Sequence, residues 1–167
     1  MTKIKFGTDG WRAIIAKEYT TDNVARVAYA TAQWVKNNSE NHSVVIGHDC
    51  RFAGRLFTET TISVLIAEGI KVYTSESFVS TPMVSLSTMI HKAFAGIVIT
   101  ASHNPPSYNG FKIKAHYGGP AIQKEIDEVE SLIPESQEYE IIPFDTLKEN
   151  SLVEIIDMEQ EYIDHVR

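Results

Sequence analysis

The sequence predicts an α/β fold: a three-layer α/β/α sandwich with a mixed, mostly parallel sheet of about four strands. Short β-branched runs alternate along the chain with segments whose apolar residues recur at helical spacing, which is the pattern of βαβ units. The run 95–101 (AGIVITA) is apolar at nearly every position, as a strand covered by helices on both faces must be. We therefore expect 95–101 to be central in the sheet.

The first elements follow in order from the spacing of the apolar residues. Residues 20–38 form an amphipathic helix that begins in polar residues able to cap it. A buried strand over 43–47 comes next, because this run is β-branched and is bounded by polar residues and glycine. Residues 56–67 form a second helix, and Gly69 stands where a left-handed residue ends a helix. Residues 70–73 form another strand.

A third helix is expected over 81–90, with Thr81 as its cap and Pro82 as its first helical residue. After the central strand, Asn109-Gly110 can make a tight turn that sends 111–115 back as an antiparallel strand. This strand makes the predicted sheet mixed. Residues 120–132 then form an acidic helix.

The pattern divides the chain into a domain over 1–150 and a shorter segment over 151–167. From Pro134 onward the composition is acidic and strand periodicity is lost, which is typical of a connector. Apolar residues return at helical spacing over 152–163, and no helix stop signal follows before the last residue. We therefore expect 151–167 to be a linker that leads into a second domain.

Composition and charge argue against some classes of partner. No apolar run approaches the roughly 20 residues of a membrane-spanning helix, the N-terminus has no secretory signal, and Cys50 is the only cysteine. We expect a cytoplasmic protein without a membrane partner. Residues 1–120 hold 12 Lys and Arg against 8 Asp and Glu, whereas 121–167 hold 3 against 14. This distribution argues against nucleic acid as a partner and leaves a small anionic substrate open.

The segment 100–110 (TASHNPPSYNG) begins where the most apolar strand ends. Ligands of open α/β sheets collect beyond the carboxyl ends of the strands, so Ser102 would stand there, with His103 beside it. Pro105 and Pro106 stiffen the loop and hold the serine in one arrangement before a substrate arrives. By residue type alone an ordinary loop is the better interpretation. A serine hydrolase is weaker still, because it needs Gly-x-Ser-x-Gly.

Three further patterns present charged side chains. In 6–12 (FGTDGWR), two glycines allow a tight turn that presents Arg12, whose planar guanidinium suits phosphate, although an ordinary Asp-Gly turn is an equally good interpretation. Asp49 and Arg51 follow a predicted strand as an orienting ion pair beneath the site or as a solvated loop pair, and we favour the solvated pair. Lys112, with Lys114 on the same side of its strand, would attract phosphate toward Ser102, although strand lysines more often protect an exposed edge.

These motifs resemble those of the α-D-phosphohexomutases, the phosphoglucomutase, phosphomannomutase and phosphoglucosamine mutase family. Residues 100–105 (TASHNP) look like the family's phosphoserine loop. Residues 6–12 look like its N-terminal signature, and 110–113 (GFKI) look like the strand after the loop. The segment 47–51 is similar more loosely. The resemblance covers about the first 115 residues, in the family's order.

The resemblance implies the phosphoserine domain of an enzyme that interconverts hexose 1-phosphate and hexose 6-phosphate through a bisphosphorylated sugar. It implies that Ser102 carries the phosphoryl group, that Arg12 and Lys112 bind substrate and stabilise charge, and that His103 positions groups or moves protons. It also implies Mg²⁺, bound here only through the Ser102 phosphate, and a hexose 1,6-bisphosphate activator. The partners would be a hexose phosphate and domains II–IV, without which this domain would be inactive. A non-catalytic sugar-phosphate-binding module remains an alternative, as does phosphoglucosamine mutase within the family.

Overall fold

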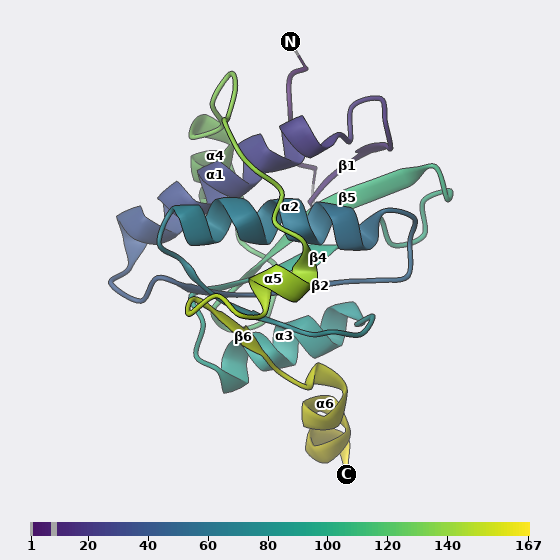
Figure 1. Ribbon diagram of the computed structural model, residues 1–167, viewed down its shortest axis with the longest axis vertical. Coiled ribbons are helices and arrows are strands. Elements are labelled where there is room, and N and C mark those ends of the chain that lie inside the picture. Colours follow the sequence, from purple (N-terminus) through teal and green to yellow (C-terminus); the bar gives the residue numbers. More distant parts are fainter. Residues whose placement is uncertain (1, 8–9) are drawn as a thin grey trace.

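Figure 1 shows a computed structural model of the chain, which describes residues 2–7 and 10–167. The described residues form one six-stranded sheet in the order β1-β5-β4-β2-β3-β6. The strands are β1 (Trp11–Ile14), β2 (Ser43–His48), β3 (Lys71–Thr74), β4 (Ala95–Ile99), β5 (Tyr108–Ala115) and β6 (Val153–Ile155). The helices are α1 (Thr21–Asn38), α2 (Gly54–Ala67), α3 (Thr81–Ile90), α4 (Gln123–Ser131), α5 (Phe144–Leu147) and α6 (Met158–Val166).

The sheet is mixed and mostly parallel, as predicted. β4, β2, β3 and β6 pair in parallel, and β5 alone runs in the opposite direction, between β4 and β1. The structure has six strands rather than about four, because β1 and β6 extend the two edges. Neither strand was predicted, because β1 begins within the segment 6–12 that was expected to form a turn, and β6 lies in a segment whose apolar residues have helical spacing.

The expected central strand is confirmed. All five residues of β4 are buried, and β4 pairs with β5 on one side and β2 on the other. Ile97 faces Ile46 of β2 and Ile113 of β5, so one face of the sheet carries a continuous apolar row. This face contributes to the larger of the hydrophobic clusters.

Helices cover both faces of the sheet and give the three predicted layers (Figure 1). One face packs with α1, α2 and α4 in the larger cluster, to which the buried side chains of Trp34, Leu65 and Val129 belong. The other face packs with α3 and α6 through a second cluster that includes Val84 and Met158. Thr20 caps α1 by accepting a hydrogen bond from the Asn23 N–H at 3.2 Å, as its sequence suggests.

The turn after β4 differs from the prediction. Asn109 and Gly110 lie within β5, and the chain reverses over residues 102–107 instead. The Thr100 N–H donates to the Gly110 carbonyl at 3.0 Å, and a Cβ on Gly110 would lie 2.5 Å from the Thr100 carbonyl oxygen. Gly110 is therefore needed for the close approach of two backbones rather than for a tight turn.

The segment after Asn150, which was expected to be a linker into a second domain, contains a strand and a helix. Val153–Ile155 forms β6, which is anchored by a bond from the Val72 N–H to the Leu152 carbonyl at 2.7 Å. The helical spacing belongs to α6, which packs on α3, where Ser87 donates to Glu161 at 2.5 Å. The apolar residues of the short strand also fit the helical spacing of the residues that follow, so the sequence pattern did not distinguish the strand from the helix.

Two smaller observations complete the fold. Ser80, not Thr81, is the N-cap of α3, so the helix begins one residue earlier than predicted. Within the part of the chain that the structure describes, no helix is both long and apolar enough to cross a membrane.

Candidate functional site

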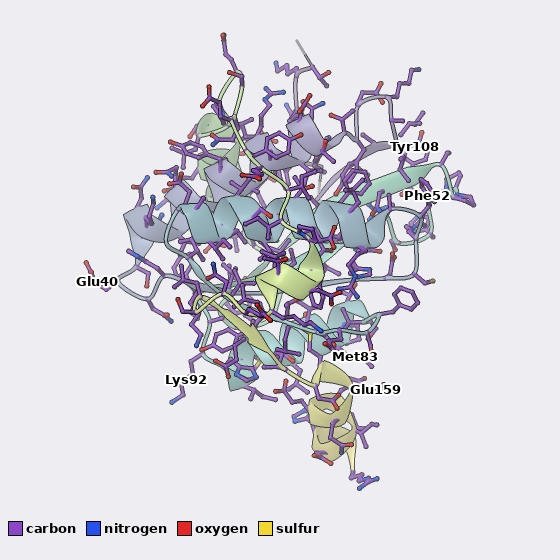
Figure 2. The ribbon with its side chains drawn as sticks, in the orientation of Figure 1. Glu40, Phe52, Met83, Lys92, Tyr108 and Glu159 are labelled. Atoms are coloured by element: carbon purple, nitrogen blue, oxygen red, sulfur yellow. The ribbon has the colours of Figure 1, made fainter. Side chains whose placement is uncertain are left out.

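The Ser102 loop lies at the carboxyl ends of β2 and β4, beside a crevice of about 330 Å³. Figure 2 labels Phe52, on the segment between β2 and α2, and Tyr108, the first residue of β5. The Asn109 side chain joins the start of β5 to the segment after β2 by donating to the Phe52 carbonyl at 3.4 Å. The crevice is lined by Asp49, Val79, Ser80, Thr81, Val98, Thr100, Ser102 and His103. Two expected site residues, Ser102 and His103, thus lie with the start of α3.

Ser102 combines an exposed side chain with a fixed backbone. Its φ is 54°, a left-handed conformation that non-glycine residues rarely adopt. Its N–H donates to the Thr100 hydroxyl at 3.0 Å, and this hydrogen bond stabilises the conformation. The result is an accessible hydroxyl on a backbone that is already ordered.

Asp49 and Arg51 are not the solvated loop pair that the residue types favour. The Asp49 carboxylate accepts hydrogen bonds from the Thr100 hydroxyl at 2.5 Å and from the Arg51 N–H at 3.0 Å. Its Oδ2 lies 3.7 Å from the Arg51 Nε. The pair therefore connects the end of β2 to the Ser102 loop, which is the orienting arrangement.

The Arg51 guanidinium donates to four main-chain carbonyls of the Ser102 loop. Nη2 donates to the carbonyls of Ser102 and Asn104, both at 2.7 Å. Nη1 donates to the carbonyls of Pro105 at 2.9 Å and Tyr108 at 3.1 Å. One side chain thus contacts both ends of the loop and its middle.

Arg12 and Lys112 lie on the sheet face that borders the crevice. Arg12 pairs with Gly110 across β1 and β5, and its Nη1 donates to the Asn104 side-chain oxygen at 2.7 Å. Lys112 pairs with Val98, which lines the crevice. Lys112 and Lys114 lie beyond the part of β5 that pairs with β1, but both are buried, and Lys114 forms an antiparallel bridge with Pro120, so these lysines do not protect an exposed edge.

The N-terminal signature packs against Lys112. The Gly7 N–H donates to the Gly10 carbonyl at 3.0 Å, which closes the expected turn, although Thr8 and Asp9 lie outside the described residues. Gly10 has a φ of 96°, and a Cβ there would lie 2.6 Å from the Phe111 carbonyl oxygen and 3.0 Å from the Lys112 Cγ. Glycine is required at this position by both its conformation and the close approach of the β5 backbone at Phe111 and Lys112.

His48, at the end of β2, is a buried residue near the site that sequence reasoning did not select. Because Asp49 offers a main-chain carbonyl, the His48 Nδ1 donates to it, at 2.8 Å. Burial lowers the His48 pKa, which favours the neutral ring.

Thr100 and Asn104 also entered no prediction, although both lie within the TASHNP motif and their hydroxyl and amide groups can order a loop.

A metal site is not formed by protein side chains in residues 2–7 and 10–167, where no group of three His, Cys, Asp or Glu residues comes together in a suitable arrangement. The exposed Ser102 hydroxyl beside the crevice would allow a phosphate on this serine to offer one oxygen to a metal ion held mainly by other groups. A phosphorylated Ser102 would therefore supply one ligand of a metal ion whose other ligands come from elsewhere.

Known proteins resemble this chain in sequence and in structure. A Staphylococcus haemolyticus phosphoglucomutase is 34% identical over 98% of this chain and 28% of its own length. A phosphoglucosamine mutase of Caldanaerobacter subterraneus is 36% identical over 80% of this chain and 30% of its own. A crystal structure from Thermus thermophilus that bears the name of phosphomannomutase superimposes with a TM-score of 0.87 and 34% identity, over 98% of this chain and 35% of that one.

The chain spans less than a third of the length of these two curated relatives. Residues 3–140 match the family described as "Phosphoglucomutase/phosphomannomutase, alpha/beta/alpha domain I". The match includes the Ser102 loop, Arg12, Lys112 and the Asp49–Arg51 segment. The chain therefore belongs to the α-D-phosphohexomutase family of isomerases, of which it forms domain I.

Proposed function

We propose that this chain is the phosphoserine domain of a phosphohexomutase and that Ser102 carries the migrating phosphoryl group. The observation that carries the proposal is the exposed Ser102 hydroxyl on an ordered loop, beside a crevice at the carboxyl ends of β2 and β4. The family membership supplies the reaction class, the interconversion of hexose 1-phosphate and hexose 6-phosphate. The same proposal includes a cytoplasmic location.

In the first step, the bond between phosphorus and the Ser102 Oγ breaks, and phosphorus bonds to a free hydroxyl oxygen of the hexose phosphate. The proton of that hydroxyl passes to a base, and the Oγ takes up a proton. A bisphosphorylated sugar results. Its other phosphoryl group then returns to the Ser102 Oγ, so the net reaction moves phosphate between O1 and O6. His103 is the candidate for the proton transfers, because it lines the same crevice as Ser102.

Phosphoryl transfer depends mainly on positioning and on cations that stabilise the transferred group. Arg12 and Lys112 would supply charge from this chain, since both lie on the sheet face that borders the crevice. Mg²⁺, which the family resemblance implies, would supply further positive charge at the group, and this chain would contribute to it one oxygen of the Ser102 phosphate. Ser80 and Thr81 present the start of α3 to the same crevice, where the helix dipole favours a phosphate.

Binding of the sugar and its second phosphate would fall to domains that this chain does not include. The relatives are more than three times as long as the matched chain, which leaves room for domains II–IV. We therefore expect the 167 residues alone to show no mutase turnover. Whether the natural sugar is that of the phosphoglucomutases or of the phosphoglucosamine mutases would also be decided outside this chain.

The test joins this chain to the remaining domains of the Staphylococcus haemolyticus relative, in place of that enzyme's own first domain. With Mg²⁺ and glucose 1,6-bisphosphate, we expect conversion of glucose 1-phosphate to glucose 6-phosphate. Ser102→Ala should lower kcat by about a thousandfold or more, since it removes the nucleophile. Ser107→Ala changes another exposed serine of the same loop and should retain activity.

Peptide mass spectrometry of the same protein provides a second measurement. Phosphate should be found on Ser102 after incubation with the bisphosphate and be absent from Ser102→Ala. Full turnover of Ser102→Ala would disprove the proposal. Binding of hexose phosphate by a folded protein that never takes up phosphate would favour the non-catalytic module instead.

A further inference from the structure

We propose that Arg51 is a positioning residue, which fixes the backbone that carries Ser102 without itself binding phosphate. The proposal that this role matters for phosphoryl transfer rests on the function proposed above. Arg51 is largely covered, with its side chain 14% exposed, so it acts within the protein rather than at its surface.

The hydrogen bonds of the Arg51 side chain indicate that it positions the loop rather than binding phosphate. A guanidinium has five N–H donors, and four of them face the carbonyls of Ser102, Asn104, Pro105 and Tyr108. The Nε atom lies 3.7 Å from the Asp49 Oδ2, which is an ion-pair distance and too long for a hydrogen bond. The four Nη donors are thus all used within this chain. A phosphate on Ser102 would have to break one of these contacts to bind Arg51.

Arg51 is itself held in place by the sheet. Its N–H donates to the Asp49 Oδ1 at 3.0 Å, and the Asp49 N–H donates to the Ile99 carbonyl at 3.2 Å. The Asp49 Oδ2 accepts from the Thr100 hydroxyl, which in turn accepts from the Ser102 N–H. The loop is therefore tied to β4 along two routes, one through Arg51 and one through Thr100.

The need for four donors in a fixed plane makes arginine specific at this position. A lysine ammonium has three donors on a single nitrogen and cannot reach carbonyls that are spread along the loop from Ser102 to Tyr108. In Arg51→Lys, at least one of the four carbonyls must lose its bond to residue 51. The local backbone should then open more often, although the charge is retained.

The first test is amide hydrogen exchange of this chain, read by NMR. The N–H groups to follow are those of Ser102, Asn104 and Tyr108. In Arg51→Lys we expect these three to exchange about tenfold faster or more, with the amides of β2 and β4 unchanged. Arg55→Lys is the matched control, because the Arg55 guanidinium donates to the Glu76 carbonyl at 2.6 Å and should leave the loop unaffected.

Thr100→Val separates the two routes and serves if Arg51→Lys does not fold. This change removes the hydroxyl that accepts from Ser102 and donates to Asp49. Amide exchange should become faster at Ser102. It should stay unchanged at Asn104 and Tyr108, because Arg51 still binds the carbonyls of these two residues. Unchanged exchange in Arg51→Lys, or loss of protection at all three amides in Thr100→Val, would overturn the proposal.

The second test measures kinetics in the joined enzyme described above. Because a displaced nucleophile affects the chemical step, Arg51→Lys should lower kcat by about 10- to 100-fold and leave the KM for hexose phosphate within about twofold. Arg55→Lys should change neither. A wild-type kcat in Arg51→Lys, with Ser102→Ala inactive, would refute the positioning role while the proposed function stands. An active Ser102→Ala would refute the function, and the exchange data would still decide whether Arg51 holds the loop.

Discussion

Ser102 shows how a residue type that favours an ordinary loop becomes a candidate nucleophile once its neighbours are in place. The φ of 54° costs energy for a residue with a Cβ, and such a conformation persists only where surrounding contacts impose it. Those contacts come from Thr100 and Arg51. Free energy of folding is thus used to keep the serine in one conformation before any substrate binds.

The sequence predicted the residues of this site better than it predicted their connections. Ser102, His103 and Arg12 were selected from motifs, and the structure brings them to one end of the sheet. Arg51 was expected to be solvated, because an Asp-x-Arg segment in a loop does not reveal which backbone it will meet. Its four carbonyl partners lie more than 50 residues further along the chain, so no local pattern could identify them.

The buried His48 ring predicts how stability depends on pH. Because the folded state lowers the His48 pKa, the unfolded chain binds the proton first as the pH falls through about 6.5. The free energy of unfolding should therefore decrease as the pH is lowered through that value. His48→Asn keeps a donor for the Asp49 carbonyl but does not titrate, so its free energy of unfolding should fall less over the same interval.

Urea unfolding between about pH 7.5 and pH 5.5 measures this difference. His165→Asn, on an exposed turn of α6, is the control and should follow the wild type. If the wild type and His48→Asn lose stability in parallel, the buried ring does not contribute to the pH dependence.

At the scale of elements, the approach of α3 to the sheet depends on Gly96 in β4. A Cβ on Gly96 would lie 2.4 Å from the Thr88 Oγ1 and 3.3 Å from the Val84 Cγ1. Gly96→Ala should therefore push α3 away and lower the free energy of unfolding by about 1–3 kcal/mol, as overpacked cores do. Denaturant unfolding gives the value.

Gly7→Ala is the matched change, because a Cβ there would be 3.7 Å from its nearest neighbour, the Gly10 carbonyl oxygen. Its stability should stay within about 0.5 kcal/mol of the wild type. Equal stability of Gly96→Ala and Gly7→Ala would mean that α3 can shift without cost.

Strands β2, β3 and β4 were predicted from their apolar and β-branched residues, and the edge strands β1 and β6 were not. β2 and β4 are buried at every position, so their composition alone identifies them. β1 and β6 are strands only because a longer neighbour offers hydrogen bonds, β5 for one and β3 for the other. Their pairing is decided by the assembled sheet, which a local reading of the sequence does not contain.

At the scale of the molecule, the domain boundary expected at residue 150 can be tested by truncation. A chain that ends at Asn150 lacks the buried side chains of Val153, Ile156 and Met158, each worth roughly 1.5–3 kcal/mol as an upper estimate. It also exposes the edge of β3, which can pair with another molecule. We expect a clearly lower Tm and self-association in sedimentation experiments.

Removal of the exposed residues 164–167 alone is the control and should leave both properties unchanged. If the chain that ends at Asn150 keeps the wild-type Tm and stays monomeric, the segment 151–167 acts as the predicted linker despite its contacts with β3 and α3.

The Ser102 loop has both of its ends rooted in paired strands, since Ile99 of β4 lies opposite Phe111 of β5. Because both of its ends are fixed in the sheet, this loop would not carry a group bound to Ser102 from one site to another. If Ser102 carries the phosphoryl group, as proposed, the acceptor sugar would have to bind at the serine and reorient there between the two transfers. Under that proposal, the movement between the two transfers would come from the ligand and from the parts of the enzyme that enclose it.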